Sequence, residues 1–132
     1  MTAISRNAVN TGARGILSGT ISNGASWYED IEITENGTVI ASADTWDWTL
    51  TFRDPEIDDS AVLTLTTDDD LIISQGSDST TVQIRVAKAD ISALEGEYVV
   101  DLKSLDTSDT TYDSAGKSIH WAHGRVTVLA EP

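Results

Sequence analysis

TWDWTLTFR, residues 45–53, decides the fold class of this chain. Large apolar side chains occupy every second position of this stretch, and polar or charged side chains occupy the positions between them. Because successive side chains of a strand point to opposite faces, this alternation predicts a β-strand with one face in a core and the other in water. Pro55 follows shortly afterwards and ends the strand.

The same alternation recurs on both sides of this stretch. Apolar residues alternate in five further segments: Ile31 and Ile33; Ala61, Leu63 and Leu65; Val82, Ile84 and Val86; Tyr98, Val100 and Leu102; and Val126 and Val128. Short turn-forming segments separate them, such as Asn36-Gly37, which suits a type I′ turn. Helical spacing is nearly absent, and Lys88–Leu94 has room for one helical turn. The chain is therefore predicted to be all-β, either a sandwich or a barrel.

The segment Leu94–Leu102 favours the sandwich. Tyr98 stands at the start of a late strand, just after a short turn. This spacing resembles the tyrosine corner of Greek-key sandwiches, in which the tyrosine hydroxyl bonds to backbone upstream. We therefore predict an immunoglobulin-like Greek-key β-sandwich of about seven strands over residues 25–132, preceded by an extended N-terminal arm over residues 1–24.

In the last predicted strand, the residues expected on one face occupy odd positions in residues 119–123 but even positions in residues 126–128. A β-bulge at Gly124 would restore the pattern. On a regular strand His120 and His123 point to opposite faces and would not share a metal ion, unless the bulge begins before Gly124.

The charge of the chain is unevenly distributed. Residues 1–28 contain Arg6 and Arg14 and no acidic residue, so they carry +2 of the formal net charge of −14, and the rest carries −16. Residues 1–24 are also rich in glycine and are not expected to become ordered alone, apart from a short strand around Ile16–Ile21. We expect the arm to bind an acidic surface. The alternative is a terminus without a binding role.

The composition excludes several functions. Without cysteine the chain forms no disulfide, thiolate metal site or cysteine nucleophile. The net charge of −14 opposes binding to nucleic acid and to anionic membranes. The first residues lack the pattern of a secretion signal, and no stretch is apolar enough for a membrane span. Neither a catalytic constellation nor a cofactor site is predicted, and Asp68-Asp69-Asp70 lacks the spacing of a calcium-binding loop.

Four tryptophans are the side chains best suited to contact other molecules. Trp46 and Trp48 share the apolar face of their strand and are expected in the core. Trp27 and Tyr28 are adjacent and project to opposite faces of a strand, so one of them is expected at the surface as an interface anchor. Trp121 fits either core or surface. The predicted contact residues are Arg6, Arg14, Trp27, Tyr28 and Trp121.

Four motifs together resemble the small immunoglobulin-like modules of tailed-bacteriophage virion proteins. They are Gly24-x-x-Trp27, the strand Trp46–Pro55, the corner Leu94–Leu102 and the closing run His120–Val128. The resemblance covers residues 24–129, and the arm departs from it. It implies a virion structural protein, either a capsid cement or decoration protein or a tail or baseplate component. Such a protein binds other virion proteins and copies of itself, and it has no catalytic residues.

Two other functions are compatible with a small acidic β-domain. A carbohydrate-binding module is commonly a β-sandwich with surface tryptophans, and a calcium-dependent adhesion domain would use the acidic turns. A glycan platform requires several exposed coplanar rings, which fits this sequence less well because two tryptophans are expected in the core.

Overall fold

The computed structural model describes residues 2–6, 15–16, 18–35, 37–40, 42–56, 61–67, 69–111 and 113–130. Its strands are β1 (Thr2–Arg6), β2 (Gly15–Ile16), β3 (Gly19–Ser22), β4 (Trp27–Glu35), β5 (Asp47–Arg53), β6 (Ala61–Thr66), β7 (Leu71–Gln75), β8 (Thr80–Val86), β9 (Gly96–Asp106) and β10 (Lys117–Leu129). The helical elements described are η1 (Ala43–Thr45) and α1 (Lys88–Ile91). The all-β prediction is confirmed.

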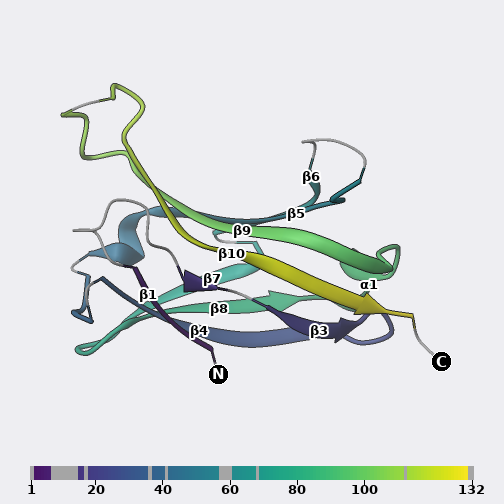
Figure 1. Cartoon of the computed structure of the whole chain (residues 1–132). Helices are drawn as coiled ribbons and strands as arrows, with labels where there is room; N and C mark the ends of the chain where they lie inside the picture. Colours follow the sequence, from purple (N-terminus) through teal and green to yellow (C-terminus); the bar gives the residue numbers. More distant parts are fainter. Residues whose placement is uncertain are drawn as a thin grey trace.

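The strands form two sheets that face each other (Figure 1). One sheet has the order β1-β4-β8-β7, and the other has the order β2-β10-β9-β5-β6, with β3 also beside β10. The chain changes sheet after β1, β3, β4, β6 and β8, so each sheet contains strands from distant parts of the sequence. The predicted sandwich is therefore confirmed, and the described part of residues 25–132 contains the seven strands β4 to β10.

The described strands of residues 1–24 lie at the edges of both sheets. β1 runs parallel to β4, from Thr2 opposite Ile31 to Arg6 opposite Glu35. β2 and β3 run parallel to β10, and they account for the short strand predicted around Ile16–Ile21. We expected residues 1–24 to need another molecule to become ordered. The structure differs, because the described strands of this segment pair with β4 and β10 of the same chain. Edge strands have unpaired backbone donors and acceptors, and β1 covers part of the β4 edge, from Ile31 to Glu35.

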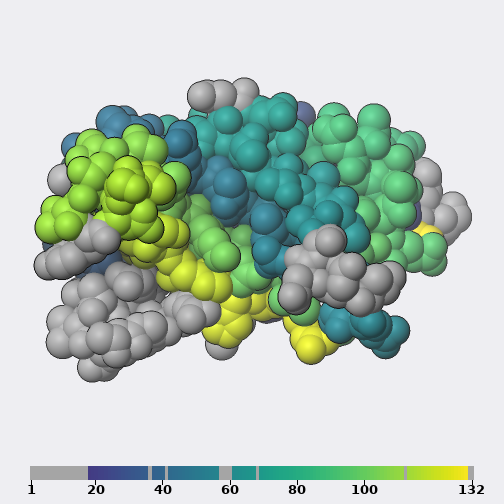
Figure 2. Space-filling view, turned by 90° about the horizontal axis from the view of Figure 1, so that it is seen from above, coloured from purple at the N-terminus to yellow at the C-terminus, as the bar shows by residue number. Residues whose placement is uncertain are grey.

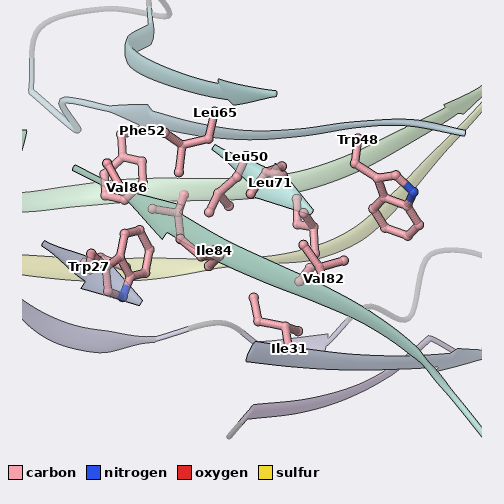
Figure 3. Close-up of a cluster of buried hydrophobic side chains, with 14 of the residues drawn as sticks. Trp27, Ile31, Trp48, Leu50, Phe52, Leu65, Leu71, Val82, Ile84 and Val86 are labelled. Atoms are coloured by element: carbon pink, nitrogen blue, oxygen red, sulfur yellow. The ribbon is translucent and has the colours of Figure 1, made fainter. Parts of the chain in front are cut away.

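The core lies between the two sheets and centres on tryptophan. Trp48 stacks on Trp46 and on Trp121, with ring centroids 6.2 Å and 5.8 Å apart. Figure 3 shows side chains of the two sheets pointing toward one another, among them Trp48 and Phe52 from β5 and Val82 from β8. The burial of Trp48, Leu50 and Phe52 confirms the alternation predicted for this strand.

Buried indole N–H groups require an acceptor, and both fully buried tryptophans have one. Trp48 Nε1 donates to the backbone oxygen of Ala43 at 2.9 Å. Trp121 Nε1 donates to Ser104 Oγ at 2.8 Å. These bonds fix how each ring lies in the core.

A β-bulge interrupts β10, but it lies earlier than predicted. The register with β9 shifts between His120 and Ala122, and both Trp121 and Ala122 are buried. The prediction of a bulge at Gly124 is therefore wrong in position. The reason is that Trp121 is anchored by its stack and its hydrogen bond, so the extra residue is accommodated directly beside it.

The predicted tyrosine corner joins α1 to β9. Tyr98 Oη donates to the backbone oxygen of Glu95 and accepts from its backbone N–H, both at 3.1 Å. Gly96 has a φ of 106°, a conformation that L side chains rarely adopt. The Tyr98 ring is buried and packs against Phe52, so the corner attaches the incoming turn to the core.

Tyr98→Phe keeps the ring and removes both bonds to Glu95. Because Glu95 is exposed and water can replace the hydroxyl, we expect the free energy of unfolding to fall by about 1 kcal/mol. Urea denaturation followed by tryptophan fluorescence measures this change. The matched control is Tyr28→Phe, whose ring is 71% exposed and whose stability should equal that of the wild type. An equal effect of the two substitutions would contradict the role of the corner.

Candidate interaction surface

The two arginines predicted as contact residues are placed differently. Arg6 is the last residue of β1, and its backbone lies opposite Glu35 of β4. Arg14 lies outside the described residues. The structure therefore places one positively charged residue of the predicted arm beside an acidic residue of the same chain.

Of the three aromatic residues predicted to contact other molecules, two lie in the core and one lies at the surface. Trp27 is 7% exposed and meets Phe52 edge-on, with centroids 5.7 Å apart, and Trp121 is fully buried. The expectation that these two tryptophans contact other molecules is corrected, because both rings are buried in the core between the two sheets. Tyr28 is 71% exposed, so the prediction that one residue of the Trp27-Tyr28 pair reaches the surface is confirmed.

Tyr28 belongs to a small group of side chains on the outer face of β4 and β8. Arg85 lies opposite Tyr28 in the register, with its Cζ 5.4 Å from the centre of the tyrosine ring. Arg85 Nη2 also lies 2.8 Å from Asp30 Oδ1. The cation–π contact and the ion pair hold the tyrosine and the arginine in one arrangement. We call Tyr28, Asp30 and Arg85 the Tyr28 surface.

The molecular surface is hollowed on both sides of Tyr28. One hollow of about 400 Å³ lies between Ser18–Ile21 and Trp27–Glu29, with Val126 also lining it. A second, of about 360 Å³, is lined by Tyr28, Glu29, Asp30 and Arg85. Tyr28 is the exposed aromatic ring shared by both linings.

The edge of β4 is incompletely covered beside the first hollow. β1 pairs with Ile31–Glu35, and among the described residues no strand pairs with Trp27–Asp30 on that edge. A strand edge of this kind can accept an extended segment of another protein through backbone hydrogen bonds. The open edge, the hollow and Tyr28 together form a candidate site for contact with another protein.

Sequence reasoning found Tyr28 but missed Asp30 and Arg85 as its neighbours. Asp30 follows two positions later on the same strand, so alternation could have placed it on the same face. Arg85 lies 57 positions after Tyr28 in the sequence, on β8, and the pairing of β4 with β8 brings it close. Nothing in the sequence alone indicates which strands pair.

Acidic residues crowd where the chain enters β7. Burial and repulsion by Asp69 and Asp90 together raise the pKa of Asp70 above its ordinary value. The backbone of Asp70 is held in place, since its carbonyl oxygen accepts a hydrogen bond from the backbone N–H of Arg85 at 2.9 Å. This acidic turn is therefore a region of concentrated negative charge.

The described residues contain no cluster of three or more histidine, cysteine or acidic side chains suited to a metal ion. The α-helix described in this structure has four residues, and no helix in the described part of the chain could cross a membrane. No model of a known protein family matches the sequence, and comparison with curated proteins gives no match.

Asp70→Asn should stabilise the fold at neutral pH. A pKa that is higher in the folded state than in the unfolded state means that ionisation opposes folding. The stability that Asp70 contributes is thus complete below its ordinary pKa of 3.8 and is lost as the pH rises through the raised value. We expect the variant to melt at a higher temperature than the wild type at pH 7 and to match it at pH 3.

Thermal unfolding at several pH values measures the Asp70→Asn effect. Asp78→Asn, at an exposed position in the turn between β7 and β8, is the matched control and should leave the profile unchanged. An Asp70→Asn variant with a lower melting temperature than the wild type at pH 7 would contradict the repulsion of Asp70 by Asp69 and Asp90.

Proposed function

We propose that this protein is a bacteriophage virion structural protein that binds other virion proteins and copies of itself, without catalysis. It would act as a capsid cement or decoration protein or as a tail or baseplate component. We also propose that its sandwich is of the immunoglobulin-like Greek-key type.

Three features support the immunoglobulin-like assignment. Such domains bury a tryptophan on a central strand, carry a tyrosine corner on a late strand and alternate strands between two sheets. Trp48 on β5 and Tyr98 on β9 match the first two features. Within the described part of residues 25–132, the changes of sheet after β4, β6 and β8 match the third.

The observation that carries the binding function is the Tyr28 surface beside the open edge of β4. Tyrosine and arginine are enriched among residues that dominate protein–protein binding energy. Here the two residues are already in contact, so they lose little freedom when a partner binds.

The tryptophans weigh against the carbohydrate-binding alternative. Trp27, Trp48 and Trp121 are buried, and Trp46 is partly buried against the core. Sugar rings stack on exposed aromatic faces, and no tryptophan of this chain is exposed. Protein contact therefore fits the exposed surface better than glycan contact does.

Quantitative mass spectrometry of purified phage particles tests the proposal. We expect the wild-type protein in the particles, with many copies for capsid decoration and few for a tail or baseplate component. Tyr28→Ala should fold as the wild type does but be at least about tenfold depleted from particles, since removing a central binding residue typically costs 2 kcal/mol or more. Absence of the wild-type protein from particles would overturn the proposal.

The matched control is Val62→Ala, which truncates another exposed apolar side chain, 46% exposed on β6 in the other sheet. It should be incorporated normally. Equal incorporation of both variants would refute the role of the Tyr28 surface, and equal loss would show that particle assembly is sensitive to any exposed truncation.

A further inference from the structure

β6 forms one edge of its sheet and lacks the features that protect most edge strands. Figure 2 looks onto this sheet, in which β6 is teal, and no strand of the described residues pairs with β6 on the side away from β5. Natural edges are commonly protected by charged side chains, proline or bulges. β6 contains no charged residue and no proline, and its register irregularity with β5 is confined to its start at Ala61 and Val62. Leu63–Thr66 is therefore a regular edge that can accept a further strand.

The neighbouring edge strand of the other sheet, β7, is partly covered. Gln75 Nε2 at the end of β7 donates to the backbone oxygen of Ile40 at 2.9 Å. Leu71 at the start of β7 forms an isolated bridge with Thr67. Within the described part of the chain, no bridge of this kind covers residues 63–65 of β6. Of these two edges, β6 is the more open.

The backbone of β6 has hydrogen-bonding groups on its open side. The N–H of Thr67, directly after β6, donates to the backbone oxygen of Trp48 in β5 at 3.1 Å. Backbone groups of an antiparallel strand alternate between its two sides, so those of Leu63 and Leu65 also face β5, and those of Thr64 face away from it. Thr64 is thus the residue through which an added strand would form hydrogen bonds.

An added strand would also extend the core. Along β6, Leu65 is buried and Leu63 is half-buried against the core. Side chains of a strand alternate between its two faces, so apolar side chains at every second position of an added strand would lie beside Leu63 and cover it. The edge therefore suits a segment with alternating apolar residues.

Acidic residues lie at both ends of this uncharged strand. At its C-terminal end, the backbone N–H groups of Asp69 and Asp70 donate to the carbonyl oxygen of Thr66 at 3.3 Å and 3.2 Å. At its N-terminal end, the turn from β5 contains Asp54 and Glu56, where the Glu56 N–H donates to Asp54 Oδ1 at 2.9 Å. These backbone contacts hold the acidic residues close to the two ends of the edge.

The charges at the ends decide which kind of strand fits. If β6 paired with β6 of a second copy, acidic ends would face acidic ends in either orientation, because both ends of the strand are acidic. A segment with lysine or arginine at each end and no charge between them would instead place opposite charges together at both ends. Juxtaposed like charges oppose a wrong partner, so the edge favours the basic-ended segment over a second copy.

We propose that the open edge of β6 binds an extended segment of another protein by strand addition. The segment has about five uncharged residues with apolar side chains at alternate positions, and lysine or arginine at each end. This edge is separate from the Tyr28 surface, which lies on the other sheet. Strand addition uses the backbone, so truncating the side chain of Val62 leaves it intact. The proposal does not depend on the virion role, because it is tested in solution.

Synthetic peptides test the proposal, with binding to the purified full chain measured by fluorescence anisotropy. The probe is the segment Val-Thr-Val-Thr-Val with two lysines at each end. One comparison peptide keeps the lysines and replaces the centre by glycine and serine, which separates strand addition from general attraction to an acidic chain. Another keeps the centre and carries glutamates at its ends. We expect the probe to bind at least about tenfold more tightly than either peptide.

Two pairs of variants locate the binding at β6. Thr64→Pro removes the outward N–H and leaves the groups that face β5 in place, as edge strands tolerate. It should weaken probe binding by at least about tenfold, whereas Thr64→Val keeps the N–H and should bind as the wild type does. Asp69→Lys and Asp78→Lys change the net charge equally, but only Asp69 is bonded to the end of β6, so only Asp69→Lys should weaken binding.

Circular dichroism and melting temperature verify that the variants fold. A probe that binds no more tightly than the glycine–serine peptide would overturn the proposal, and so would probe binding that neither Thr64→Pro nor Asp69→Lys weakens. Self-association of the wild type that Thr64→Pro abolishes would also overturn it, because a second copy would then occupy the edge.

Discussion

The burial of the Trp48 indole between the two sheets is the constraint on which the rest of the structure depends. The ring stacks on Trp46 and Trp121, and its N–H is satisfied by the backbone of Ala43. Truncating a buried tryptophan typically costs about 3–5 kcal/mol, against a total stability of about 5–15 kcal/mol for a domain. No disulfide supports this core, because the chain has no cysteine, so packing around the indole must hold the sheets together.

Core packing also decides what reaches the surface. Trp121 is held by Trp48 on one side and by Ser104 Oγ at its nitrogen, and the bulge follows from that anchoring. The bulge turns both histidines outward to the side of the sheet where Arg53 and Asp101 meet. The outward position of both histidines is therefore a consequence of how one tryptophan is packed.

The outer faces of the two sheets differ in kind. The Tyr28 surface combines an exposed aromatic ring with hollows and an open strand edge, which suits a partner that contributes an extended segment. The outer face of β5, β9 and β10 carries charges that are paired within the chain, Arg53 with Asp101 and Arg125 with Glu97. The Tyr28 surface and these charge pairs lie on the outer faces of opposite sheets.

The sequence by itself determined the strands and the corner, because both depend on local order along the chain. The alternation of residues 45–53 predicted the burial of Trp48, Leu50 and Phe52. The spacing around Tyr98 predicted that its hydroxyl bonds to backbone upstream, and the partner in the structure is Glu95. The pairing of strands could be learned only from the tertiary structure, since backbone hydrogen bonds do not depend on which side chains the paired residues carry. It placed Arg85 over Tyr28 and Arg53 against Asp101, buried Trp27 and Trp121, and joined β1 to β4. These outcomes depend on which surfaces meet across the sandwich, and that is settled only when the whole core packs.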